Sequence, residues 1–475
     1  MDEFLSLNSV FIVFYYFTVS VLVILIILEH RNPGKAFAYI FLLLLFPVVG
    51  LVLYFVFGFH YQKKVLYKRL RNYHNDFLKN IQLKRNLPKK EFEGTLEKLS
   101  DLFYNIDRVQ FSERNEVQIL FNGESKFPVV LQELSKAKKF IYLDYYIINN
   151  DDIGNEVFNL LLEKAKEGVI VKVLYDDVGS TFSRKRKEEL RSAGIEIHSY
   201  MPVLFSQFAH KANYRNHRKM MLIDGFTGFL GGINISDKYI NNGSDKVYWR
   251  DTHVMIKGEA TTEMQFLFIN DWFYATGKKV SPVMDVDFSS IQEKTYACVL
   301  GSEYGSNFET IMEAFLGLIS LAKKEIIITT PYFVPSVTIL QLLKIKAKCG
   351  IKVKLLLPRK PDIKTAFFAS HSYISEMIES GVEVYAYTKG MMHAKTMVID
   401  KKICTIGSTN FDQRSFSLNS EVNAFFINRD LSKKLVEQFN KDMKNAYLID
   451  LTSLKNRPWY KKGISAAARL LAPIL

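Results

Sequence analysis

The stretch NHRKMMLID, residues Asn216–Asp224, decides the fold because the chain repeats its pattern as MHAKTMVID, residues Met392–Asp400. In both copies a lysine follows the histidine by two residues and an aspartate follows it by seven. The copies continue as GFTGFLGGIN and KKICTIGSTN, each an apolar run that ends in small residues and an asparagine. A strand, a short turn and a returning strand fit each copy, so the sequence predicts two equivalent β-hairpins.

The sequence around the two hairpins is also duplicated. Each half is predicted to contain a helix, a strand, a second helix that ends at a glycine, and a strand of β-branched residues. The glycines, Gly168 and Gly350, are 350 − 168 = 182 residues apart, and so long a period excludes a solenoid. The paired segments are LSKAKKFIYLDYYI (134–147) with ISLAKKEIIITTPYFV (319–334), and LLLEKAKEGVIVKVLYDD (160–177) with QLLKIKAKCGIKVKLLLPRK (341–360).

This alternation of strands and helices predicts an α/β fold in which helices flank a mixed β-sheet. We expect two duplicated domains packed together, at residues 111–280 and 281–475. The second domain ends in the tail WYKKGISAAARLLAPIL (459–475). That tail is predicted either to lie at a bilayer interface, with its aromatic residues at the headgroups, or to pack as a plain terminal helix.

The hairpin geometry predicts which side chains meet. Because side chains alternate along a strand, His217 and Lys219 share one face, and Asn234 returns beside His217 at the end of the second strand. The corresponding residues of the second half are His393, Lys395, Ser408 and Asn410. We therefore expect histidine, lysine, asparagine and serine side chains to form the site.

Asp224 and Asp400 fall at the turns of the two hairpins. Seven residues of extended chain, at about 3.3 Å each, place them roughly 20 Å from their histidines. On this argument the aspartates fix the hairpins, although they belong to the same repeated motif.

Two imidazoles, two ammonium groups and amide or hydroxyl donors suit the transfer of a phosphodiester. The lysines, with Asn234, Ser408 and Asn410, are expected to bind the phosphate and to stabilise the charge that grows on its oxygens. A neutral histidine can attack phosphorus, and a protonated one can deliver a proton to the leaving alcohol. The residues contain no metal-ligand pattern, and the scattered cysteines Cys298, Cys349 and Cys404 predict neither a disulfide framework nor a zinc site. We expect no metal and no cofactor.

The first 60 residues predict a transmembrane hairpin. Residues 10–28 and 36–58 contain no charged side chain, and about 20 such residues span a hydrocarbon core as a helix. A cleaved signal peptide is the alternative for the first segment, but the chain begins Met1-Asp2-Glu3 rather than with a basic region.

Residues 61–110 are predicted to be a basic juxtamembrane linker, which begins YQKKVLYKRLRN. Its positive charge predicts that the body lies on the cytoplasmic side. Lys plus Arg exceed Asp plus Glu by 63 − 49 = 14 over the whole chain. That excess favours anionic partners, either nucleic acid or an acidic bilayer face.

At these residues the chain resembles the phospholipase D superfamily, whose pattern is HxKxxxxD followed by GGxN or GSxN. The matching residues are His217, Lys219, Asp224, Gly231, Gly232 and Asn234, and His393, Lys395, Asp400, Gly407, Ser408 and Asn410. One departure is Gly232, where the second half has Ser408. The resemblance implies that the histidine, lysine and aspartate of each copy form the catalytic set, and it favours His217 as the nucleophile. It also implies a carboxylate that orients each histidine, by position Asp251 in WRDTH and Glu421 in LNSEVN.

More closely, the chain is similar to the bacterial cardiolipin synthases. The similarity covers nearly the whole chain and includes LDYYIINND, LYDDVGS, GGINISDKY, WRDTHVMIKG, TPYFVPS and the terminal ARLLAPIL. It implies that two phosphatidylglycerols give cardiolipin and glycerol through a phosphohistidine, without a metal or organic cofactor. It also implies a multi-pass protein of the bacterial cytoplasmic membrane that binds phosphatidylglycerol and other anionic lipids.

Three other functions use related chemistry. A phospholipase D-type hydrolase would resolve the intermediate with water, and a transphosphatidylase would act on other phospholipids. A nuclease of the same superfamily would suit the positive charge, but the membrane hairpin and the lack of an aromatic and basic strip argue against nucleic acid. A scaffold without activity does not fit two complete motifs.

Overall fold

The computed structural model describes residues 2–28, 33–46, 49–51, 54, 94–200, 215–243, 247–302, 309–470 and 472. The chain forms two compact units, an amino-terminal helical unit and the body that carries both halves of the duplication. Residues 61–93 of the predicted basic linker lie outside the described residues.

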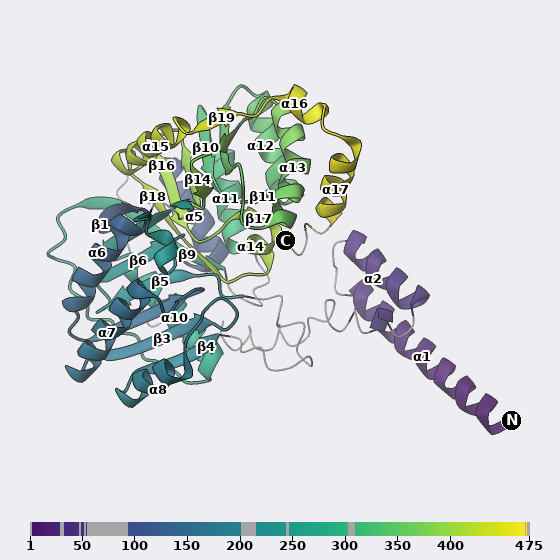
Figure 1. The fold of residues 1–475 in the computed structure, drawn as a ribbon, viewed down its shortest axis with the longest axis horizontal. Coiled ribbons are helices and arrows are strands. Elements are labelled where there is room, and N and C mark those ends of the chain that lie inside the picture. Colours follow the sequence, from purple (N-terminus) through teal and green to yellow (C-terminus); the bar gives the residue numbers. More distant parts are fainter. Residues whose placement is uncertain are drawn as a thin grey trace. The chain divides into compact units, whose positions relative to one another are not determined.

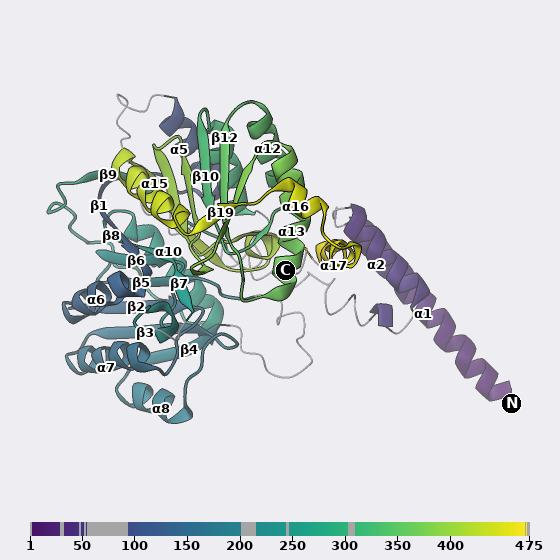
Figure 2. The same cartoon turned by 45° about the horizontal axis from the view of Figure 1, so that its top comes forward.

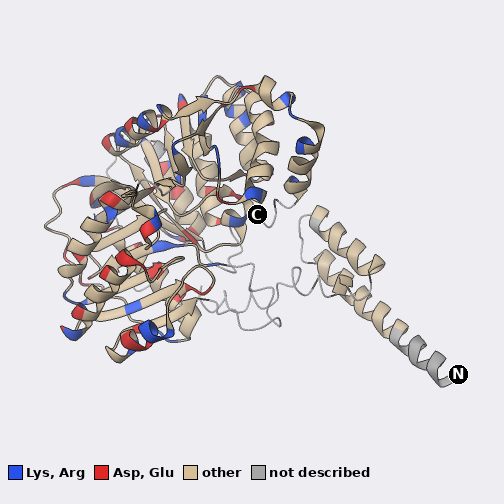
Figure 3. Cartoon of the chain, viewed as in Figure 1, with Lys and Arg blue, Asp and Glu red and all other residues tan. Residues whose placement is uncertain are grey.

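The amino-terminal unit contains two helices that pack against each other, α1 (Asp2–Leu28) and α2 (Pro33–Leu45). Val19 and Ile26 of α1 are buried together with Leu43 of α2. From Ile12 to Leu28, α1 carries no charged residue (Figure 3), and most of its remaining large apolar side chains are exposed. The unit is therefore small, with an apolar exterior.

These helices differ in extent from the predicted hairpin. The second helix was predicted at 36–58; α2 begins at Pro33 and ends at Leu45, residues 49–51 are helical again, and residues 47–48, 52–53 and 55–58 of the predicted span lie outside the described residues. Pro47 follows two residues later, and a proline disfavours the helical conformation of the residue before it. Over the part of the chain that the structure describes, no helix has both the length and the apolarity needed to cross a membrane.

The first half of the body alternates strands and helices (Figure 1). Its elements are β1 (Ser112–Phe121), α6 (Asn122–Ser135), β2 (Phe140–Tyr145), α7 (Asp152–Lys166), β3 (Ile170–Asp176), α8 (Arg184–Ser192), β4 (Glu196–Tyr200), β5 (Lys219–Ile223), β6 (Thr227–Gly231), the short helix η3 (Asp237–Tyr239), β7 (Tyr248–Arg250), β8 (Thr252–Gly258) and α10 (Thr261–Thr276).

The second half repeats this order and adds elements at its end. It comprises β9 (Lys294–Ser302), α11 (Thr310–Leu321), β10 (Glu325–Thr329), β11 (Phe333–Val334), α12 (Val337–Lys348), β12 (Lys352–Pro358), α13 (Lys364–Glu379), β13 (Glu383–Tyr387), β14 (Gly390–Met392), β15 (Thr396–Ile399), β16 (Ile403–Gly407), β17 (Phe411–Asp412), α14 (Gln413–Ser417), β18 (Glu421–Ile427), α15 (Arg429–Met443), β19 (Ala446–Leu448), α16 (Leu451–Lys455) and α17 (Trp459–Leu470).

The predicted mixed sheet and the duplication are confirmed, and the two halves share one continuous sheet. Its order is β19-β13-β12-β10-β15-β16-β18-β9-β1-β8-β6-β5-β2-β3-β4. The strands β2, β3 and β4 are parallel, as are β10, β12 and β13, while the remaining neighbours are antiparallel. The antiparallel pair of β1 and β9 joins the halves at the centre.

Three hydrophobic clusters hold the body together. The helices α6 and α7 cover one face of the first half, and α11, α12 and α13 cover the corresponding face of the second (Figures 1 and 2). The third cluster contains residues of both halves and lies under α10 and α15. The halves are therefore joined by a common core as well as by the sheet.

Residues 94–110, which the sequence assigned to the linker, contain a helix of the body. This helix, α5 (Thr95–Asp107), packs against α11 and buries Leu99 and Phe103 in the core of the second half. Phe103 stacks on Phe111 at a centroid distance of 5.3 Å. The apolar spacing of α5, rather than the basic character of the preceding segment, decides where it lies.

The terminal helix α17 packs against α13. The Arg469 guanidinium lies 2.6 Å from a carboxylate oxygen of Glu376, and Ala468 is buried at the contact. The opposite face is open, because Trp459 is 83% and Leu470 81% exposed. The tail thus packs on the body and still presents large apolar side chains outward.

Candidate active site

The backbone of each histidine motif is hydrogen-bonded to the opposite half of the body. The backbone N–H of His217 donates to the carbonyl of Ser420, which immediately precedes β18, at 2.9 Å. The backbone N–H of His393 donates to the carbonyl of Arg250 at 2.8 Å, and β14 pairs in parallel with β7. Backbone hydrogen bonds therefore hold each histidine beside a strand of the other half.

The orienting carboxylates are exchanged in the same way. Nδ1 of His217 lies 2.9 Å from Oε1 of Glu421, and Nδ1 of His393 lies 2.6 Å from Oδ2 of Asp251. Both carboxylates are buried, at 0% and 1% exposure. The sequence left open which carboxylate serves which histidine, and the structure pairs each imidazole with the carboxylate of the other half.

The charged groups of both halves act on one another. The pKa of His217 is lowered to about 4, mainly by burial; Lys219 and the ammonium of Lys395 in the other half add to this effect, and Glu421 opposes it. Burial also lowers the pKa of Lys219, while Glu421 and Asp251 act against it. Such interactions weaken with distance, so the two half-sites form a single site.

Burial favours the neutral form of both imidazoles. Burial lowers the pKa of His393 as well, and Lys395 adds to this effect while Asp251 opposes it. Burial lowers the pKa of Lys395 to about 8, so this side chain stays mostly protonated at neutral pH. An anionic phosphate bound here would raise the pKa values of all these groups.

The two lysines lie back against their own motifs. Nζ of Lys219 donates to the carbonyl of His217 at 2.5 Å, and Nζ of Lys395 donates to the carbonyl of His393. Nζ of Lys395 is also 2.9 Å from Nδ1 of His393. Each ammonium is thereby held beside its histidine, where it can neutralise a bound anion.

The expected phosphate donors have other partners in this structure. Ser408 Oγ donates to Oε2 of Glu421 at 2.5 Å and so steadies the carboxylate behind His217. The Asn234 side chain accepts from the N–H of Ile147 at 3.1 Å and donates to the Tyr239 hydroxyl at 2.5 Å. These two side chains support the site from behind.

The third expected donor, Asn410, approaches the carboxyl of Asp412. Its hydrogen bond opposes burial, which raises the pKa of Asp412 to about 6. The Asn410 amide oxygen is buried without a hydrogen-bond partner among the described residues.

The motif aspartates lie at the far ends of the hairpins. The Asp224 carboxylate accepts three backbone N–H groups where β2 begins, at 2.7–2.9 Å, and Asp400 does the same where β10 begins. Both adopt the left-handed conformation, with φ of 55° and 52°. The structure does not bring them to the histidines, and their contacts are those of turn residues.

Sequence comparison agrees with this geometry. Residues 130–272 and 315–443, more than half of the chain, match the family described as cardiolipin synthase, PLD-like domain. The chain belongs to the cardiolipin synthase family. Residues 17–58 match a second family, the phospholipase D-nuclease N-terminal domain.

Individual relatives cover almost the whole chain. A cardiolipin synthase of Alkalihalophilus pseudofirmus is 38% identical over 97% of this chain and 93% of its own length. The major cardiolipin synthase of Bacillus subtilis is 36% identical over 99% of this chain and 100% of its own length. Among solved structures, the phosphatidylserine synthase of Haemophilus influenzae is 15% identical with a TM-score of 0.62 and covers 80% of this chain and 100% of its own. The last likeness shows a shared fold.

The difference between Gly232 and Ser408 in this member of the family has a steric cause. A Cβ atom at Gly232 would lie 2.1 Å from Oδ1 of Asp251, far inside van der Waals contact. Asp251 thus occupies the space that a side chain at position 232 would need. Only glycine leaves room for the carboxylate that serves His393.

Aromatic side chains around the histidines were missed by the sequence analysis. Tyr146 lies edge-on to His217, with ring centroids 5.0 Å apart, and its ring is 5.1 Å from Nζ of Lys219. Trp249 lies edge-on to His393 at 5.1 Å. One feature of the sequence pointed to each residue: Tyr146 lies within LDYYIINND, and Trp249 lies two residues before Asp251.

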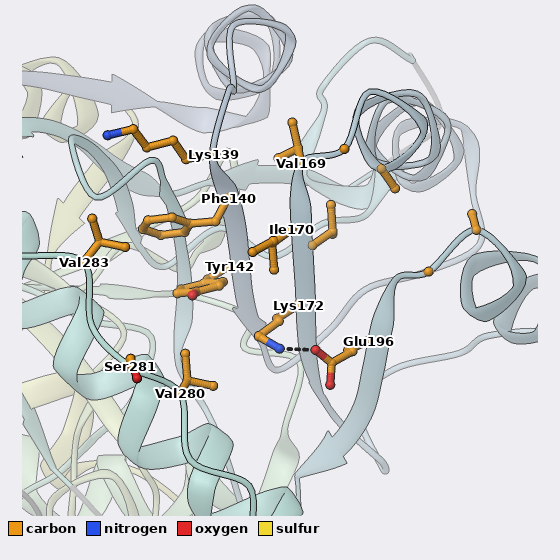
Figure 4. Close-up of a pocket in the computed structure, with 15 residues that line it drawn as sticks. Lys139, Phe140, Tyr142, Val169, Ile170, Lys172, Glu196, Val280, Ser281 and Val283 are labelled. Atoms are coloured by element: carbon orange, nitrogen blue, oxygen red, sulfur yellow. Dashed lines mark hydrogen bonds and ion pairs between the residues drawn. The ribbon is translucent and has the colours of Figure 1, made fainter.

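An open pocket of about 640 Å³ lies elsewhere, at the opposite end of the first hairpin. Phe140, Tyr142, Val169 and Ile170 line it together with the segment around Val283 (Figure 4). The N–H of Phe140 is one of the three that donate to Asp224, so Phe140 lies at the end of β2 that is remote from His217. This pocket is therefore separate from the candidate active site.

Proposed function

We propose that the protein is a cardiolipin synthase that transfers a phosphatidyl group between two phosphatidylglycerols through a phosphohistidine. The observation that supports this mechanism most directly is the exchange of carboxylates, which gives one site two oriented imidazoles, one from each half. Membership of the cardiolipin synthase family supports the choice of lipid substrates.

In the first step Nε2 of His217 attacks the phosphorus of phosphatidylglycerol. The bond from phosphorus to the glycerol headgroup breaks, and the imidazolium of His393 gives its proton to the departing glycerol oxygen. Glu421 accepts the Nδ1–H of His217 and stabilises the positive charge that forms on the ring. Lys219 and Lys395 offset the negative charge on the phosphoryl oxygens.

In the second step the now neutral His393 removes a proton from a glycerol hydroxyl of a second phosphatidylglycerol. That oxygen attacks phosphorus, the phosphorus–nitrogen bond breaks, and cardiolipin and neutral His217 are released. Atoms and charges balance over the two steps, with His393 carrying the transferred proton. The reaction is reversible because glycerol can repeat the attack.

The geometry supports His393 as the acid and base. Its bond to Asp251, at 2.6 Å, is shorter than the 2.9 Å bond between His217 and Glu421. A short bond to an ionised carboxylate favours the protonated imidazole. The charge of a bound phosphate raises the pKa of His393 further, so that it can carry a proton when substrate is present.

The amino-terminal unit is proposed to anchor the protein in the bacterial cytoplasmic membrane. The apolar residues 10–28 and 36–58 support a two-pass hairpin, and the basic residues between 63 and 71 support a cytoplasmic body. Residues 17–58, which include most of both apolar segments, match a phospholipase D-nuclease N-terminal domain. The exposed Trp459 and Leu470 of α17 supply a further apolar face for the bilayer interface.

Purified protein incubated with labelled phosphatidylglycerol alone tests the reaction. Equimolar cardiolipin and glycerol are expected, whereas phosphatidic acid as the only product would favour the hydrolase. With phosphatidylethanolamine as the only lipid, transfer to added alcohol would favour a transphosphatidylase of broader substrate range.

Alanine variants test the two-histidine mechanism. His217→Ala and His393→Ala are both expected to abolish turnover. His393→Ala protein denatured in SDS without acid is expected to retain covalently bound labelled lipid when a donor with a good leaving group is used, and His217→Ala protein to retain none. Substantial turnover by either variant would contradict the mechanism.

A further inference from the structure

A third cation lies beside the candidate active site. Lys238, in the short helix η3, is half-buried, and its Nζ is 4.7 Å from the ring centroid of Trp249 and 5.1 Å from that of Tyr239. The same two rings lie 5.1 Å and 6.0 Å from the ring of His393. Two aromatic rings thus connect Lys238 to His393.

Unlike the two motif lysines, Lys238 has no polar partner among the described residues. Lys219 and Lys395 donate to the backbone carbonyls of their histidines, whereas Lys238 makes only cation–π contacts. Burial lowers the pKa of Lys238, and two carboxylates, Asp362 and Asp251, act against this effect. Asp362 itself accepts the hydroxyl of Tyr332. An ammonium group held on aromatic rings beside a reactive centre is available to bind an anion.

We propose that Lys238 binds the phosphodiester of the acceptor lipid during the second step, an inference that rests on the proposed cardiolipin synthesis. The acceptor hydroxyl must reach His393, which removes its proton. In phosphatidylglycerol that hydroxyl belongs to a glycerol whose other end carries a second anionic phosphate. This phosphate must therefore lie near His393 but outside the Lys219–Lys395 pair, which holds the reacting phosphoryl group. Lys238 lies on this side of the site.

The two steps differ in their need for this subsite. In the first step the leaving group is free glycerol, which carries no phosphate. In the second step the acceptor brings a negative charge close to the phosphoryl group already bound, and the two anions repel each other. A cation at Lys238 offsets this repulsion for the lipid acceptor and gives no advantage to a neutral alcohol or to water. Lys238 would thus favour transfer to phosphatidylglycerol over hydrolysis.

The test measures how the phosphohistidine partitions between acceptors. Wild-type protein and Lys238→Met are incubated in mixed micelles with labelled phosphatidylglycerol and a fixed concentration of ethanol, and cardiolipin, phosphatidylethanol and released glycerol are quantified. For Lys238→Met the ratio of cardiolipin to phosphatidylethanol is expected to fall by about tenfold or more, the loss of one hydrogen bond to a charged group. The total release of glycerol is expected to stay within about twofold of wild type, and Lys238→Arg to restore most of the ratio.

Lys187→Met is the matched control. Lys187 also lies over two aromatic rings, 4.8 Å from that of Tyr175 and 5.6 Å from that of Phe182, but it belongs to α8, away from the histidines. Its ratio of products should equal that of wild type. An unchanged ratio in Lys238→Met, or a parallel loss of glycerol release and of both products, overturns the acceptor subsite alone. Wild-type protein that makes no cardiolipin overturns the proposed function and the subsite with it.

Discussion

Asp400→Asn separates the structural role of the motif aspartate from a catalytic one. Oδ2 of Asp400 accepts the N–H of Lys323 at 2.8 Å, and Oδ1 accepts those of Lys324 at 2.7 Å and Glu325 at 2.9 Å. Asparagine tolerates the left-handed backbone at this position, where φ is 52°, so the substitution changes the hydrogen bonds and the charge but not the turn.

The cost follows from these three bonds. The asparagine oxygen can keep two of them, but its NH₂ group faces the third N–H and cannot accept from it. Losing one bond to a charged acceptor costs roughly 1.5–3 kcal/mol, and turning the other two into neutral bonds costs about 0.5–1.5 kcal/mol each. The expected loss of unfolding free energy is therefore about 2.5–6 kcal/mol. If the body unfolds as one unit, this corresponds to a fall of roughly 3–7 °C in Tm.

Thermal unfolding of the detergent-solubilised protein, followed by circular dichroism, gives the stability, and cardiolipin formation per folded molecule gives the activity. Asp285→Asn is the control, because Asp285 is exposed and makes no hydrogen bond or ion pair with the described residues. The control should unfold like wild type. An Asp400→Asn protein with wild-type Tm but a large loss of specific activity would refute the turn argument and return the aspartate to the catalytic set.

Two further predictions concern Gly232 and His371. In Gly232→Ala the new Cβ displaces Asp251, so cardiolipin synthesis should fall at least about a hundredfold, as when a triad carboxylate is lost. Gly463→Ala, where a Cβ meets open space, should keep full activity, and equal losses in both variants would contradict the steric reading. Burial lowers the pKa of His371 to about 4, below its unfolded value of about 6.5, so the unfolded chain takes up the proton first and stability falls as the pH drops from about 6.5 towards 4. In urea unfolding, the His371→Gln protein should lose less unfolding free energy between pH about 6.5 and about 4 than wild type. An identical pH dependence in both proteins would contradict the lowered pKa of His371.

The sequence predicted those features that depend on local pattern. The hairpins β5–β6 and β15–β16 follow from apolar runs around a turn, and the glycines that end α7 and α12 adopt φ of 91° and 83°. The mixed sheet follows from alternating helices and strands. These signals lie within a few residues of the elements they specify, so one sequence carries them.

Contacts between distant segments could not be read in the same way. The bond between His217 and Glu421 spans 204 residues, and that between His393 and Asp251 spans 142. Glu421 begins β18 and Asp251 immediately precedes β8, and a pattern of apolar residues predicts such a strand without its neighbours. The assignment of α5 failed for a similar reason, because Leu99 and Phe103 bury their side chains against a helix more than 200 residues later.

The exchange of carboxylates between the halves also explains why the two halves differ in the residues beside Asp251 and Glu421. Asp251 and Glu421 differ by one methylene, and each half adjusts the residue beside its carboxylate, with Gly232 in the first and Ser408 in the second. The shorter acid reaches His393 only because glycine leaves space for it, whereas the longer acid is steadied by a serine hydroxyl on its way to His217. Since each carboxylate bonds to the histidine of the other half, such a change alters the hydrogen bond of one histidine and leaves that of the other in place. A duplicated fold can in this way give two chemically identical side chains different roles at one phosphorus atom.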